Sequence, residues 1–166
     1  LTAPASRTVG STVYVFDHWR LSVQPGAAYS EYPVGDLVLD VNDCGNLDDT
    51  AEAVYKIRRE LTINSTNPAA GVAITVSPTD INGNGNGSTS FSRFYRDGEI
   101  VSLTAPSSVG ANPFRYWTIG GSPQGAGVTG VNVTMSAARA AVAVYWNHVV
   151  GSWSTIGAGC VGGNGL

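Results

Sequence analysis

One loop of this chain has the residue types and spacing for metal binding. Asp80, Asn82 and Asn84 stand at alternate positions before a glycine, which fits the front half of a calcium loop. Side-chain oxygens at alternate positions can surround one Ca²⁺ ion. The residue eleven positions after Asp80, where such a loop places a bidentate glutamate, is Phe91. Asn and Gly also form ordinary turns. The segment is therefore either a calcium site or a plain surface loop, and the second interpretation is favoured.

The densest charge cluster of the chain is acidic. Its members are Asp40, Asp43, Asp48, Asp49 and Glu52. Several carboxylates in one loop could hold a cation or contact a basic partner. The alternative, which we favour, is a solvated insertion that prevents a strand edge from pairing wrongly.

Residues for catalysis are scarce. His18 and His148 are the only histidines, and the chain has no Gly-x-Ser-x-Gly, His-Glu-x-x-His or Cys-x-x-Cys motif. No pair of carboxylates is marked out for glycoside cleavage. The sequence therefore predicts a protein that is not an enzyme and needs no cofactor apart from the candidate calcium ion.

The two cysteines, Cys44 and Cys160, lack the spacing of metal ligands. A disulfide between them would close a loop of more than 100 residues and contribute about 4–5 kcal/mol on the chain-entropy model. Two unpaired thiols and a bond between two chains are the other interpretations.

Composition excludes several functional classes. Only 13% of the 166 residues are charged and the net charge is −3, so no basic stripe exists for nucleic acid. The longest basic cluster, Lys56 with Arg58 and Arg59, is predicted to be a solvated strand end. No apolar run reaches the roughly 18–20 residues that span a membrane. The chain begins with Leu1, which favours a processed or excised piece of a larger precursor.

The elements that position these residues follow an internal repeat. Its landmarks occur twice in the same order: Leu-Thr-Ala-Pro at 1–4 and 103–106, a glycine at 10 and 110, Phe-x-x-Trp at 16–19 and 114–117, and Ala-x-Ala-Val-Tyr at 51–55 and 141–145. The tail after Tyr145 loosely resembles the segment after Tyr55. The chain therefore starts within one repeat and ends near the start of another.

The aromatic pairs of the repeat are Phe16 with Trp19 and Phe114 with Trp117. Each ring can bury about 150–250 Å², enough to organise a small module. Because both pairs stand at equivalent landmarks, we predict core packing rather than a platform for sugar stacking. Trp146 and Trp153 lie outside the landmarks and are the candidates for an interface or a ligand surface.

Alternating β-branched residues at 61–64 and 71–76 predict strands, and residues 37–41 and 131–135 match as another. Residues 90–95 and 99–103 are predicted to form a hairpin across an Asp-Gly turn. The run from 48 to 59 is predicted to be a strand because it matches residues 141–145. The chain is therefore predicted to be all-β, with an incomplete first module at residues 1–57, a complete second module at 58–146 and a tail at 147–166 that could donate a strand.

On its Leu-Thr-Ala-Pro, Phe-x-x-Trp and Ala-Val-Tyr motifs the sequence resembles the divergent InlB B-repeat family, β-rich modules of bacterial surface and secreted proteins. The resemblance covers residues 58–146 well and residues 1–57 in part. It implies a β-grasp-like or sandwich fold, an extracellular or cell-surface location and a spacer or adhesive role. It implies no catalytic residues.

Two functional hypotheses follow. The first is an extracellular structural or adhesive repeat protein whose partners are other surface proteins or other copies of itself. In its sharper form, the tail of one molecule completes the first module of the next, giving head-to-tail filaments. The second is a carbohydrate-binding module that binds glycans through Trp146 and Trp153.

Overall fold

The computed structural model describes residues 1–22, 30–32 and 50–147 of the chain. These residues form strands joined by turns and loops, and none of them lies in a helix, so the predicted all-β fold is confirmed. Within the same residues, no helix is long and apolar enough to cross a membrane.

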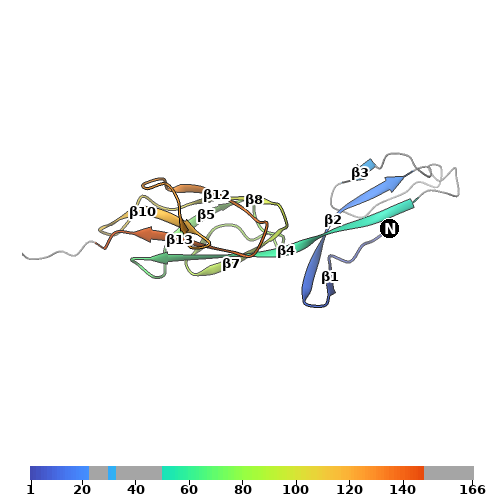
Figure 1. Ribbon diagram of the computed structural model, residues 1–166, viewed down its shortest axis with the longest axis horizontal. Helices are drawn as coiled ribbons and strands as arrows, with labels where there is room; N and C mark the ends of the chain where they lie inside the picture. Colours follow the sequence, from blue (N-terminus) through green and yellow to red (C-terminus); the bar gives the residue numbers. More distant parts are fainter. Residues whose placement is uncertain (23–29, 33–49, 148–166) are drawn as a thin grey trace, which may run out of the picture.

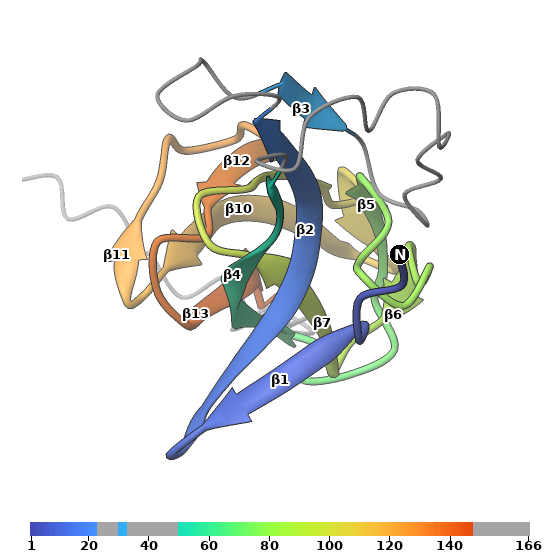
Figure 2. The same ribbon diagram turned by 90° about the vertical axis from the view of Figure 1, so that its right-hand side faces the viewer.

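The strands lie in two groups along an elongated molecule (Figure 1). The first group contains β1 (Ser6–Val9), β2 (Thr12–Ser22), β3 (Ser30–Tyr32) and the first half of β4 (Thr50–Thr66). The second group contains the rest of β4 with β5 (Ala73–Ser77), β6 (Gly87–Ser88), β7 (Phe91–Arg96), β8 (Ile100–Thr104), β9 (Ser108–Val109), β10 (Asn112–Ile119), β11 (Ser122–Pro123), β12 (Gly130–Thr134) and β13 (Arg139–Tyr145). Figure 2 looks along the molecule with β1 and β2 in front of the second group.

β4 belongs to both modules because its partner changes along its length. Residues 50–57 pair antiparallel with β2. From Arg58 the strand pairs antiparallel with β7, and from Leu61 it also pairs in parallel with β13. The predicted boundary between residues 57 and 58 thus falls at the change of partner, inside one uninterrupted strand. One continuous strand, rather than a linker outside the sheets, joins the modules.

The second module is a sandwich of two sheets around one core. One layer is the part of the nine-stranded sheet formed by β7, β4, β13 and β10, and the other is the four-stranded sheet β12-β8-β5-β6. Trp117, Tyr95 and Tyr145 are the largest fully buried side chains. Leu61 and Ile63 point into the same core from β4, two residues apart, as strand alternation requires.

A β-bulge brings each aromatic pair together. The register between β2 and β4 shifts immediately after Phe16, and that between β10 and β13 shifts immediately after Phe114. Plain alternation sends residues three apart to opposite faces, whereas one inserted residue returns them to the same face. The ring centroids of Phe16 and Trp19 are 5.7 Å apart, and those of Phe114 and Trp117 are 6.1 Å apart. All four side chains are buried, as predicted for core aromatics.

A tyrosine closes the repeat in the same way in both modules. The Tyr55 hydroxyl donates to the carbonyl oxygen of Pro4, and the Tyr145 hydroxyl donates to that of Pro106, each at 3.0 Å. Each ring also packs edge-on against the phenylalanine of its module. The sequence repeat is therefore a repeat of contacts.

The predicted hairpin of residues 90–95 and 99–103 is wrong, although both strands exist. β7 pairs with β4, whereas β8 pairs with β12 and β5 in the other sheet. The tight turn at Asp97 and Gly98, where Glu99 N donates to Arg96 O, carries the chain from one layer of the sandwich to the other. An Asp-Gly turn specifies a reversal of the chain but not which strands then pair.

We expect Trp117→Ala to lower the free energy of unfolding by about 3–5 kcal/mol, because the indole is fully buried and its loss leaves a cavity. Trp146→Ala is the matched control, since Trp146 is 52% exposed, and should cost less than about 1 kcal/mol. Chemical denaturation measures both. Equal losses would contradict the assignment of Trp117 to the core.

Candidate functional site

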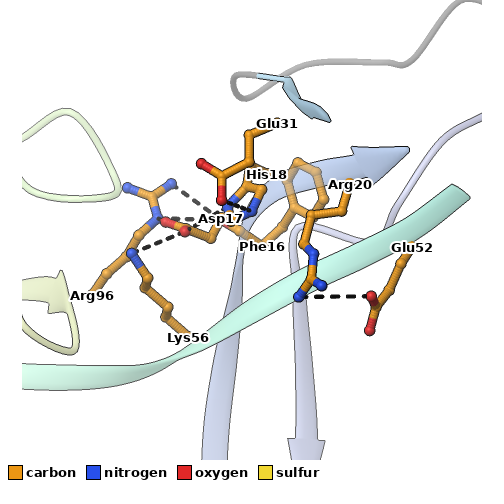
Figure 3. A network of polar contacts seen from close by, with 8 residues as sticks. All are labelled: Phe16, Asp17, His18, Arg20, Glu31, Glu52, Lys56 and Arg96. Carbon is orange, nitrogen blue, oxygen red and sulfur yellow. Dashed lines mark hydrogen bonds and ion pairs between the residues drawn. The ribbon is translucent and has the colours of Figure 1, made fainter. Parts of the chain in front are cut away.

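A network of charged side chains joins the modules where β4 passes from β2 to β7. At its centre is Asp17, the residue inserted by the first bulge, whose side chain is 14% exposed. Asp17 Oδ2 lies 3.0 Å from Lys56 Nζ and accepts a hydrogen bond of 2.9 Å from His18 Nδ1. Asp17 Oδ1 lies 3.2 Å from Nε of Arg96, on β7. Figure 3 shows the carboxylate between the Lys56 and Arg96 side chains.

Arg96 connects the second module to the backbone of the first. Its Nε and Nη2 atoms donate to the carbonyl oxygen of Phe16 at 3.3 and 3.1 Å. Beside it, Arg59 Nε donates to Asp97 Oδ1 at 2.6 Å and holds the β7–β8 turn against β4. Lys56 and Arg59, predicted to belong to a solvated strand end, are therefore ion-paired at the junction.

The network keeps Asp17 ionised. Burial alone would raise the pKa of Asp17. The hydrogen bonds from His18 and Lys56 and the positive charges of Lys56 and Arg96 lower it by more than burial raises it, so the pKa lies below its usual value. His18 Nε2, on the other side of the ring, lies 3.8 Å from Glu31. The arrangement is suited to fixing the orientation of two modules, and it contains no nucleophile paired with a base.

The second feature is the edge of β4 along residues 50–57. Within the described part of the chain, this stretch pairs with β2 on one side and with no strand on the other. The residues that face the small core of the first module from this strand are partly exposed: Ala51, Ala53 and Tyr55. A groove of about 390 Å³ lies beside this edge, lined by residues 52–55 and by Arg7, Val9, Tyr14 and Arg20.

The equivalent strand of the second module, β13, has neighbours on both sides. β10 pairs with one side, and β4 runs parallel along the other, from Leu61 opposite Arg139 to Thr66 opposite Val144. The equivalents of the three partly exposed residues are 0%, 0% and 1% exposed: Ala141, Ala143 and Tyr145. The parallel strand and the second sheet, which packs on the same core, together account for the deeper burial of the repeat landmarks in the second module.

Trp146 lies at the far end of the second module. Its side chain is largely exposed, and the guanidinium of Arg115 lies 4.1 Å from the ring centroid. Arg115 is the residue inserted by the second bulge, so it occupies the position of Asp17, and Trp146 occupies that of Lys56. The same position in the repeat therefore carries an ion pair in one module and a cation on an aromatic ring in the other.

The calcium candidates lie in a loop that is ordered by its own backbone. Asp80 Oδ1 accepts hydrogen bonds of 2.9 Å from the backbone N–H groups of Asn82 and Asn84, and Oδ2 accepts one of 3.1 Å from that of Phe94. These bonds favour the alternative of an ordinary loop, and calcium binding stays a prediction. Across the described residues, no three His, Cys, Asp or Glu side chains gather where they could hold a metal ion.

Several predicted features lie outside the described residues: Cys44, Cys160, His148, Trp153, the strand at residues 37–41 and the acidic residues Asp40, Asp43, Asp48 and Asp49. Glu52 is the member of the acidic cluster that the structure describes. Its side chain is exposed on β4, and its Oε2 atom lies 3.9 Å from Nη1 of Arg20 on β2. The sequence does not predict the junction, because no local pattern marks a bulge. Asp17 lies within Phe-x-x-Trp, but no nearby residue indicates that its partner is Arg96.

Comparisons of this chain with family models, with curated proteins and with solved structures give no match.

We expect Asp17→Asn to lower the free energy of unfolding by about 1–3 kcal/mol at neutral pH, because it leaves Arg96 and Lys56 without their carboxylate. The folded-state pKa of Asp17 is depressed, so its contribution is present above the unfolded pKa of about 3.9 and is lost as the pH falls through the folded pKa. The variant should therefore lose less stability than the parent between neutral and acidic pH.

Denaturant titrations over that pH range measure both effects. Glu52→Gln is the matched control, since its ion pair with Arg20 is exposed and should be worth less than about 1 kcal/mol. If the two variants behaved alike, Asp17 would not be the centre of the junction.

Proposed function

We propose that this chain is an extracellular structural protein of the adhesive or spacer type, whose molecules join head-to-tail by strand complementation. The observation that carries the proposal is the difference between the two modules at one edge. In the second module a parallel strand covers the edge of β13, whereas the same edge of β4 in the first module has no strand partner among the described residues. An unpaired edge beside a partly exposed core invites a strand from another chain.

The shape of the molecule supports the same function. The shared strand β4 and the Asp17–Arg96 contact set two modules in line without a linker, which suits a protein that spans distance. The exposed edge lies at one end, and β13 leads out of the other end (Figure 1). A contact between unlike ends repeats without closing unless its rotation forms a ring, so it yields filaments.

The resemblance of the repeat motifs to InlB B-repeats is the basis for the extracellular or cell-surface location in this proposal. Low charge and abundant hydroxyl and amide side chains accord with that setting. The contacts of Asp17 and Arg96 between the modules fix their orientation, which supports a structural role.

We expect the full chain to form linear assemblies that grow with protein concentration, and a variant without residues 148–166 to remain monomeric. The reason is that the deletion removes the strand donor while leaving every described strand in place. Light scattering after size-exclusion chromatography, together with electron microscopy, measures this. The thermal transition, followed by intrinsic tryptophan fluorescence, is the control for folding. A monodisperse full-length monomer at all concentrations would contradict the proposal.

A carbohydrate-binding role is the second candidate, because Trp146 presents an exposed indole next to the guanidinium of Arg115. An indole offers a broad apolar surface to a ligand, and the guanidinium beside it can donate hydrogen bonds. On this hypothesis a glycan array detects binding by the full chain, and Trp146→Ala abolishes it while the thermal unfolding transition stays that of the parent. No binding by either protein would leave the structural role alone.

A further inference from the structure

We propose that the groove beside β4 takes residues 151–156 of a second copy of this chain, in parallel, with Trp153 opposite Ala51 and Thr155 opposite Ala53. This inference rests on the proposed function and specifies the partner strand and its register. The acceptor surface consists of described residues, and the internal pair of β4 with β13 supplies the geometry.

The first step is the equivalence between the acceptor strands. Residues 51–55 of β4 and 141–145 of β13 carry the same landmarks 90 positions apart. Each strand pairs on one side with the bulged strand of its module, and the tyrosine of each stands opposite a phenylalanine: Phe16 opposite Tyr55 and Phe114 opposite Tyr145. The remaining edge of the two strands therefore has the same orientation relative to its core.

The second step is the register. In the second module Ile63 stands opposite Ala141, Asn64 opposite Val142, and Ser65 opposite Ala143. The landmarks that end in Tyr55 and Tyr145 are 90 positions apart, and the proposal applies that shift to the residues that follow them. Moving both strands by that shift places Trp153 opposite Ala51, Ser154 opposite Glu52, and Thr155 opposite Ala53.

Side-chain size supports this register. A large residue, Ile63, fits in the second module because the opposing residues of β13 are alanines, and the whole contact is fully buried. Ala51 and Ala53 repeat the small residues in the first module, and they are partly exposed there. The groove of about 390 Å³ adjoins Ala53 and Tyr55, so in this register it lies beside Thr155, the residue opposite Ala53.

The donor must come from another molecule. β13 ends level with the end of β4, because Val144 stands opposite Thr66. Ala51 lies fifteen residues earlier on β4, about 50 Å away along the strand. From Asn147 to Gly151 the chain can span at most about 14 Å. In this register the segment therefore cannot return to its own first module.

Disulfide cross-linking tests the register. The background is Cys44→Ser with Cys160→Ser. Adding Glu52→Cys and Ser154→Cys puts the two thiols on directly opposed residues, whose Cα atoms are about 4.8 Å apart in neighbouring strands. That separation lies within the Cα–Cα range of disulfides, about 4.4–6.8 Å. Glu52→Cys with Ser152→Cys is the matched control, because a two-residue offset lengthens the separation to about 8 Å, beyond reach.

After oxidation, we expect the Ser154→Cys pair to give a ladder of covalent oligomers on a non-reducing gel. The ladder should be at least about tenfold stronger than that of the Ser152→Cys pair. Equal ladders, or a stronger one from the control, would overturn the register. If the uncrosslinked full chain still assembled and the deletion of residues 148–166 still abolished assembly, the proposed function would survive that result. A full chain that never assembles would overturn both.

Discussion

The continuity of β4 is the constraint on which the rest of the structure depends. Seventeen residues form one strand, and its side chains alternate without interruption from the small core of the first module to the large core of the second. Because β2 pairs with this strand up to Ile57 and β7 pairs with it from Arg58, a bend of the strand at the junction would break pairs with β2 or with β7. The relative orientation of the modules is thus set by hydrogen bonds along the chain.

The bulges are the second constraint, because each performs two tasks. An inserted residue places the phenylalanine and the tryptophan of a module on one face, where they pack with the closing tyrosine. The inserted residue itself then lies off the ladder at the end of its module. In the first module that residue is Asp17, which contacts Arg96, and in the second it is Arg115, which contacts Trp146. One backbone device therefore builds a core and presents a contact residue.

The same repeat landmarks are buried to different extents in the two modules. In the second module, a parallel strand and a second sheet enclose the alanines and the tyrosine of β13 almost completely. In the first, the same residue types retain exposure beside a groove. A repeat protein is stabilised largely by contacts between neighbouring units. This difference in burial between the two modules is the observation on which the proposed assembly rests.

The sequence alone determined the all-β class, the repeat and the burial of the repeated aromatic residues, because side-chain alternation and repeated motifs are local properties. It did not determine which strands pair, or which side chains make contact, when they are far apart in the sequence. The tight turn at Asp97 and Gly98 predicted a hairpin, yet β7 and β8 lie in different sheets. The contact of Asp17 with Arg96, 79 positions away, requires a bulge that no local pattern marks. Only the tertiary structure decided these features, since strand pairing depends on which faces must be buried together.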